Sequence, residues 1–211
     1  MIGRMRNEMK LMGRNFFLVS SAVTFAAVGI AAAGELLVFD PLCYEVLFPF
    51  FTAVVVGEWG KTRADRNFDI IASQSRCLFR WVLLRYITGF ALAGGFAVLC
   101  MAGASIVRYE LPLWELLAIY VPPAFFLSSL CALAGIKCRQ EHTATLICGS
   151  VWLIFLLIRS LLRVPGVEYI YLFIRYAGDQ NGIWLWNKAV ITAAALLLWG
   201  IIYWLCKDFS T

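Results

Sequence analysis

Six apolar runs, each about as long as a membrane-spanning helix, occupy most of the sequence. A bilayer core about 30 Å thick needs roughly 20 apolar residues per helix, and every backbone polar group inside it must be hydrogen-bonded within the protein. The runs show no strand-like alternation, so they predict helices and not a barrel. The predicted spans cover residues 16–39, 42–57, 81–107, 113–136, 144–158 and 183–206.

The expected fold is therefore an all-α, polytopic helical membrane protein with a single six-helix transmembrane domain over residues 16–211. The fourth span contains the pair Pro122-Pro123. This pair predicts a kink or a break, because proline frees backbone carbonyl groups that neighbouring helices must then cover.

The composition excludes several classes of protein. Hydrophobic residues make up 62% of the chain and charged residues 15%, whereas a soluble domain is close to half apolar and a quarter charged. Disorder, nucleic-acid binding and a secreted disulfide scaffold are therefore not expected. The seven cysteines include no CxxC pair and the chain has one histidine, His142, so we predict no metal site and no cofactor bound by this chain.

The basic residues predict the orientation of the spans. Thirteen of the eighteen Lys and Arg residues lie at the amino end, in the second and fourth loops and their flanks, or in the carboxyl tail. Loops on the cytoplasmic side carry an excess of Lys and Arg, so both termini are expected in the cytoplasm. A signal peptide would also begin with basic and then apolar residues, but here the run is long and five more spans follow.

Residues 1–15 have the pattern of an amphipathic helix. Four apolar side chains share one helical face, and the charged side chains lie largely on the others; the apolar four are Ile2, Met5, Met9 and Met12. This predicts a helix lying on the inner membrane surface. The alternative is an ordinary basic flank that only sets the topology.

Residues 58–80 form the longest polar stretch and are predicted to lie inside the cell. The stretch mixes charges of both signs and keeps apolar residues, among them Phe68, Ile70 and Ile71, that a solvated linker does not need. It therefore predicts a docking surface, the alternative being a loop that merely connects two spans. Gly60-Lys61-Thr62 is no phosphate-binding loop, because Val55 stands where that motif needs a glycine.

Residues 159–182 are semi-apolar, rich in aromatic side chains and interrupted by Pro165, Gly166 and Gly178. They are too polar and too broken for a full span. The pattern fits an external re-entrant loop with a short helix dipping into the outer leaflet, or a folded external loop packed on the bundle.

Three charged residues lie near the outer ends of predicted spans: Glu45, Glu115 and Lys188. Charge inside a bilayer is unfavourable, so each is a candidate for function. They predict a cluster around an outward vestibule in a substrate pathway, or simply side chains that reach interfacial water. No carboxylate or lysine lies at a clear midplane, which disfavours a proton- or sodium-driven carrier.

The whole plan resembles the membrane subunits of ABC transporters of the ABC-2 class. Beyond the six spans and the amino-terminal helix, the resemblance rests on a glutamate that ends span two (Glu58), then Gly60 with Thr62, then an apolar stretch over residues 68–72, then Ser75-Arg76 before span three. Two departures occur: Gln74 stands where a proline is common, and the charged run after span two is reduced to Glu-Trp-Gly-Lys.

The resemblance implies that residues 61–71 form a coupling helix that rests in a cleft of a separate ATPase subunit. Phe68 and Ile71 would be its docking anchors, while Arg63, Arg66 and Asp69 would set its orientation. The full set of residues implied to contact the ATPase is Glu58, Lys61, Thr62, Arg63, Arg66, Phe68, Asp69, Ile70 and Ile71.

The resemblance further implies a permease, an exporter of lipid-like, peptide or drug-like molecules, in the cytoplasmic (inner) membrane of a prokaryote. ATP and Mg²⁺ would bind the partner ATPase, this chain would not be an enzyme, and a second permease copy or a homologous permease would complete the path. Two alternatives are a non-transporting membrane scaffold or accessory subunit, and a membrane-embedded enzyme. The single histidine and the absence of an obvious Ser or Asp dyad disfavour the enzyme.

Overall fold

The computed structural model describes residues 42–60, 62–63, 78–107, 112–140, 142–164, 166–178 and 182–208. Within these ranges the chain forms helices and turns, and no strand occurs. The span predicted for residues 16–39, the amphipathic helix predicted for residues 1–15, and most of the predicted coupling helix lie outside the described residues.

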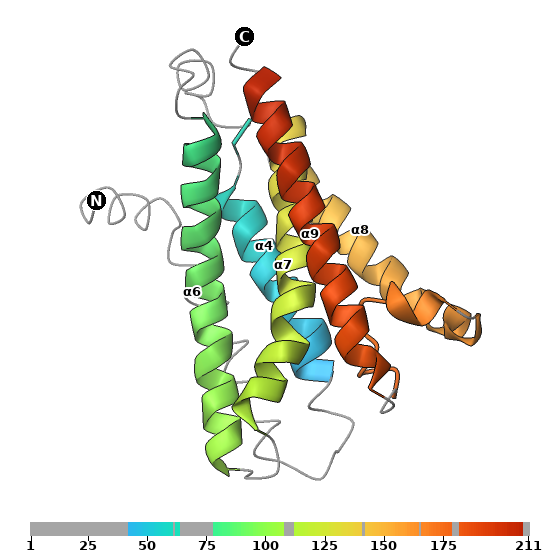
Figure 1. Ribbon diagram of the computed structural model, residues 1–211. Helices are drawn as coiled ribbons and strands as arrows, with labels where there is room; N and C mark the ends of the chain where they lie inside the picture. Colours follow the sequence, from blue (N-terminus) through green and yellow to red (C-terminus); the bar gives the residue numbers. More distant parts are fainter. Residues whose placement is uncertain are drawn as a thin grey trace.

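Five helices are long and apolar enough to cross a membrane (Figure 1). A π-helical segment, η1 (Leu42–Leu47), runs directly into α4 (Phe48–Trp59), and the others are α6 (Leu78–Val107), α7 (Leu113–Lys137), α8 (Thr143–Leu157) and α9 (Ile183–Asp208). The five matching spans predicted from the sequence are confirmed as helices, with ends that differ by three residues or fewer. By length and composition they are compatible with an integral membrane protein; six spans and the positions of the termini stay predictions.

Consecutive helices run in opposite directions, so their ends gather at two levels (Figure 1). One level holds the ends at Trp59, Leu78, Lys137 and Asp208; we call it the basic end, because Arg63, Lys137, Arg139 and Lys207 lie there. The opposite end holds Leu42, Val107, Leu113 and Ile183, together with the short 3-10 helices η2 (Ile158–Arg163) and η3 (Val167–Tyr169).

α7 is the centre of the bundle and packs against α4, α6, α8 and α9. Buried residues make up 72% of the span Leu42–Trp59 and 61% of an apolar 18-residue stretch of α7, but only 11% of the span Thr143–Ser160 and 22% of an apolar 18-residue stretch of α9. α9 turns apolar side chains outward, including Trp186 near one end and Trp204 near the other. In a bilayer these outward faces would be covered by lipid.

The helix α7 continues through Pro122 and Pro123 without the break that the sequence allowed. Both prolines are buried. Proline at these positions removes the N–H groups that would bond the carbonyls of Ala118 and Ile119, and the turns on either side keep their own hydrogen bonds. The neighbouring elements cover this stretch, as the sequence predicted for a helix with freed carbonyls.

Three polar contacts join α7 to three different helices. The Tyr120 hydroxyl lies 2.7 Å from Thr52 Oγ1 on α4, and the Ser128 hydroxyl lies 2.9 Å from Tyr86 OH on α6. Ser129 Oγ accepts a hydrogen bond of 3.0 Å from the Trp199 indole on α9. Because an unpaired hydroxyl is unfavourable away from water, these pairs also fix which faces of the helices meet.

We expect Thr52→Val to lower the free energy of unfolding by about 1 kcal/mol. Thr52 Oγ1 donates to the Phe48 carbonyl at 2.9 Å, so the Tyr120 hydroxyl must be the donor in their shared bond. Valine removes its acceptor and leaves a buried phenol unpaired. Denaturant unfolding in detergent micelles measures the loss, and Thr52→Val with Tyr120→Phe should recover most of it. A double variant no more stable than the single one would contradict this account.

Candidate functional site

A buried ion pair joins η1 to α9 at the opposite end of the bundle. The Lys188 ammonium donates to Glu45 Oε1 and, at 3.2 Å, to the Leu172 carbonyl. Glu45 has no exposed surface and Lys188 is 4% exposed. Glu45 also accepts two backbone hydrogen bonds, from the N–H of Arg175 at 3.3 Å and from that of Tyr176 at 2.6 Å. Both carboxylate oxygens of this buried acid are therefore paired.

A second ion pair adjoins the first. The Arg175 guanidinium donates to Glu115 Oε1 on α7 and lies 5.1 Å from the centre of the Trp184 ring on α9. The side chains of Arg175 and Glu115 are each about one-fifth exposed. This ion pair is therefore more accessible to solvent than the pair of Glu45 and Lys188. Glu45, Glu115 and Lys188, which the sequence predicted to cluster, thus belong to one network, with Arg175 as its link. Whether the network lines a substrate pathway stays a prediction.

Arg175 was not among the site residues predicted from the sequence. One signal was present: two acids lie near the outer ends of predicted spans, but only one basic residue, Lys188, lies beside them within a span. A buried or half-buried carboxylate needs an opposite charge. The second cation therefore had to come from a loop, and residues 159–182 contain three arginines that could supply it.

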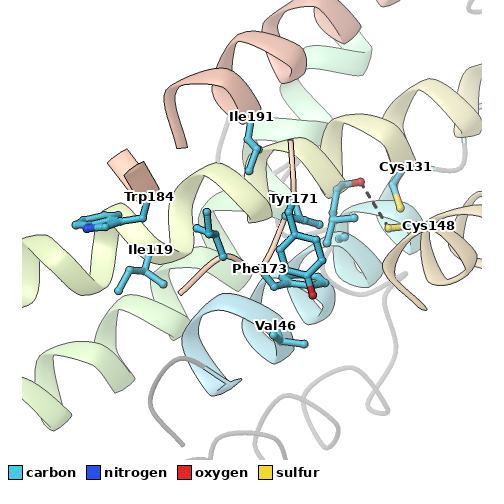
Figure 2. Close-up of a cluster of buried hydrophobic side chains, with 12 residues drawn as sticks. Val46, Ile119, Cys131, Cys148, Tyr171, Phe173, Trp184 and Ile191 are labelled. Atoms are coloured by element: carbon cyan, nitrogen blue, oxygen red, sulfur yellow. Dashed lines mark hydrogen bonds between the residues drawn. The ribbon is translucent and has the colours of Figure 1, made fainter. Parts of the chain in front are cut away.

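Residues 171–178, which we call the inserted segment, connect η3 toward α9 and enter the bundle (Figure 2). The side chains of Tyr171, Leu172, Phe173 and Ile174 are at most 1% exposed. They belong to one apolar cluster whose other buried members come from η1, α4, α7, α8 and α9: Val46, Ala53, Ile119, Leu127, Cys131, Cys148, Trp184 and Ile191. In Figure 2 the rings of Tyr171 and Phe173 lie between Val46 on one side and Ile191 on the other.

The backbone of the inserted segment forms turns, so side chains of other elements supply part of its hydrogen bonding. Asn187 Nδ2 donates to the carbonyls of Tyr171 and Glu168, each at 2.8 Å, and Arg159 Nη2 donates to the Ala177 carbonyl at 3.4 Å. Non-helical backbone is tolerated beside lipid only where protein covers it. This arrangement agrees with a folded loop packed on the bundle; a helix dipping into the outer leaflet stays a prediction.

Two polar atoms at this site are buried without a hydrogen-bond partner in the described part of the chain, namely Tyr171 OH and Asn187 Oδ1. Burial raises the pKa of Tyr171 to about 12. The phenol is therefore neutral at physiological pH, and its hydroxyl proton and lone pairs have lost water without a replacement among these residues.

The chain that leaves α4 at the basic end is fastened to α7 and α8. Glu58 Oε1 accepts a hydrogen bond of 3.1 Å from the Thr145 hydroxyl and lies 3.4 Å from His142 Nδ1. Arg63 donates twice to the end of α7, from its backbone N–H to the Gly135 carbonyl at 3.2 Å and from Nη1 to the Lys137 carbonyl at 2.9 Å.

Thr62 is 1% exposed, and its hydroxyl donates to the Gly60 carbonyl at 3.0 Å. Glu58, Thr62 and Arg63 are thus placed by the structure, and all three lie where α4, α7 and α8 meet. Six further residues of the predicted ATPase contact lie outside the described residues, namely Lys61, Arg66, Phe68, Asp69, Ile70 and Ile71. A coupling helix over residues 61–71 therefore stays a prediction.

The six cysteines in the described ranges form no disulfide with one another, and five of them are buried. In the apolar cluster, Cys148 Sγ donates to the Leu127 carbonyl at 3.6 Å, which joins α8 to α7 (Figure 2). The described residues contain no group of three or more His, Cys, Asp or Glu side chains suited to a metal ion.

Comparison of the chain with protein-family models, with curated proteins and with solved structures found no match. The resemblance stated above therefore rests on the arrangement of spans and on the residues after span two.

Proposed function

We propose that this chain is the permease subunit of an ATP-driven ABC transporter, an exporter of a lipid-like, peptide or drug-like molecule. The observation that supports this best is the attachment of the chain after α4. Glu58 and Arg63 tie the start of the polar segment to the ends of α7 and α8. A segment that receives force from a partner must be anchored to the helices that move, and this one is anchored to the central helix.

From α7 a displacement can pass to the rest of the bundle. Tyr120, Ser128 and Ser129 connect this helix to α4, α6 and α9. Closure of an ATPase dimer around ATP and Mg²⁺ would then rock α4, α6 and α7 together and change the side to which a path opens. In this proposal the basic end faces the cytoplasm of a prokaryote and the ATP chemistry belongs to the partner subunit.

A second permease, identical or homologous, completes the proposed transporter. The described helices form a bundle around α7, so a path through the full depth of the membrane would need surfaces from two such bundles, even where its outer part lies within one. The outward apolar faces of α8 and α9 contact either lipid or this second subunit.

Changing Phe68 and Ile71 together to aspartate should abolish recovery of the ATPase with the purified permease. Two apolar anchors at the centre of an interface are each worth about 2 kcal/mol or more, so the dissociation constant should rise by at least about a hundredfold. Affinity purification from membranes, followed by quantification of Walker-motif proteins, measures the result.

The control is Val164→Asp with Ile170→Asp, two exposed apolar residues at the opposite end of the bundle. This variant should retain the ATPase. If the Phe68 and Ile71 variant also retains it, residues 61–71 are not the coupling helix. If the unchanged chain recovers no ATPase, the permease proposal fails, and a non-transporting scaffold or accessory subunit becomes the better interpretation.

A further inference from the structure

We propose that the inserted segment, residues 171–178, is a releasable plug: Glu45 latches it inside the bundle, and its departure opens an apolar space between the helices toward the opposite end. The inference rests on the proposed function in one respect, because it identifies this space as the outer part of the cargo path. The release itself is a property of this chain alone.

The latch is a small number of polar contacts to one side chain. Glu45 receives the backbone N–H groups of Arg175 and Tyr176 and the ammonium of Lys188. Among the described residues, the segment is also tied to the bundle by single hydrogen bonds to its carbonyls, from Arg159, Asn187 and Lys188, and by the ion pair of Arg175 with Glu115. Two cation–π contacts add to these ties, Arg159 with the Tyr176 ring and Arg175 with the Trp184 ring. Loss of the Glu45 carboxylate therefore removes the acceptor that holds the backbone of the segment at Arg175 and Tyr176.

The docked position leaves unfavourable features that release would relieve. Tyr171 OH and Asn187 Oδ1 are buried and have no partner in the described ranges, and both would regain water if the segment left. Glycines with positive φ stand at both ends of the segment: Gly166 at 94° before it, Gly178 at 100° as its last residue and Gly182 at 78° after it. Such positions suit a hinge, because glycine adopts these angles without steric penalty.

The space that the plug fills is apolar. Tyr171, Leu172, Phe173 and Ile174 contact side chains from five elements, and Phe155 on α8 lies edge-on to the Tyr171 ring at 6.4 Å. Figure 2 shows how Val46, Ile119 and Ile191 surround the inserted rings. Of the three cargo classes proposed above, a lipid-like molecule fits such a lining best, with Glu45 and Lys188 at its outer edge.

Cysteine reporters in the full-length chain, in lipid nanodiscs and without any ATPase, test the proposal. Phe173→Cys places a thiol on the plug, Ile119→Cys places one on the wall behind it, and Ala97→Cys places one in a different buried cluster. A membrane-impermeant maleimide is added, and peptide mass spectrometry follows each position separately from the native cysteines. Each reporter is measured alone, in combination with Glu45→Gln, and in combination with Glu168→Gln.

Glu45→Gln should increase the labelling rates at positions 173 and 119 by at least about tenfold. The reason is geometric: a glutamine cannot accept both backbone N–H groups, because its amide NH₂ would face one of them. Position 97 should stay unreactive. Glu168→Gln is the matched control, since it makes the same change at a carboxylate in the loop that carries the plug, away from the latch, and it should leave all three rates unchanged.

Hydrogen exchange supplies a measurement without cysteines, in case the Phe173→Cys chain folds poorly. In Glu45→Gln the amides of Arg175 and Tyr176 should exchange at least about tenfold faster while those of α7 keep their protection. Labelling at position 173 without labelling at position 119 would mean that the loop frays and covers no path, which overturns the proposal. Equal acceleration at position 97 would mean general unfolding, and no acceleration would mean that Glu45 is no latch; each result also overturns it. Because no ATPase is present, none of these outcomes depends on the co-purification experiment.

Discussion

Lys188→Met should lower the free energy of unfolding by about 3 kcal/mol, the largest effect expected of any single substitution here. Glu45 has no exposed surface, so removal of the ammonium leaves a buried carboxylate without its counter-charge. The loss should fall at the lower end of the range for broken buried ion pairs. The two backbone N–H groups of Arg175 and Tyr176 would still stabilise the carboxylate. Denaturant unfolding in detergent micelles, monitored by tryptophan fluorescence, measures the change.

A second variant separates charge from packing. Lys188→Met combined with Glu45→Gln removes both charges and keeps one oxygen toward the backbone donors, so it should be more stable than Lys188→Met alone. The exchanged pair, Glu45→Lys with Lys188→Glu, should fail to restore stability, because position 45 faces two N–H donors that repel an ammonium. If the exchanged pair were as stable as the original, the backbone contacts would not matter and this interpretation would be wrong.

Gly135→Ala should lower the free energy of unfolding by about 2 kcal/mol through a steric conflict at the basic end. A Cβ atom on Gly135 would lie 2.6 Å from the backbone oxygen of Gly60. Backbone atoms cannot rotate away as a flexible side chain can, so α7 and the end of α4 would have to separate. The separation would also strain the Arg63 hydrogen bonds to the Gly135 and Lys137 carbonyls.

The matched control is Gly95→Ala in α6, where a Cβ atom meets no other atom within 4 Å. Alanine has the higher helix propensity, so this variant should be neutral or more stable by up to about 1 kcal/mol. Thermal unfolding of both variants in the same detergent provides the comparison. Equal behaviour of the two would show that α4 and α7 do not meet as closely as the structure has them.

The positions of the helices could be predicted because hydropathy reports a physical constraint. Residues in hydrocarbon must be apolar and their backbone must be helical, so the apolar runs alone located α4, α6, α7, α8 and α9. Their ends were less certain. The sequence placed the start of the third span at Trp81, because Arg80 looks like a flanking charge, yet α6 begins at Leu78. The helix therefore begins before the apolar run does, because backbone hydrogen bonding does not require apolar side chains.

The candidate site could be predicted in part. Glu45, Glu115 and Lys188 were identified because charge near hydrocarbon is unfavourable, and that argument needs no knowledge of the fold. Their exact pairing was not accessible. It depends on Arg175 and Tyr176, whose backbone atoms reach Glu45 across 130 and 131 positions of the chain. The path of a loop over such a distance follows from tertiary packing, which periodicity does not describe.

In a bilayer, Trp186 and Trp204 on α9 would make the thickness of the hydrocarbon layer matter to this protein. They are separated by five helical turns, so they emerge on the same side of α9 and stand about 27 Å apart along its axis, close to the depth of the hydrocarbon layer. Indole rings settle at the two boundaries of that layer. A thinner membrane therefore requires α9 to tilt, and the tilt would pull on its bonds to Ser129 and Glu45. In a membrane, the length of the lipid chains would then exert a force on the bundle.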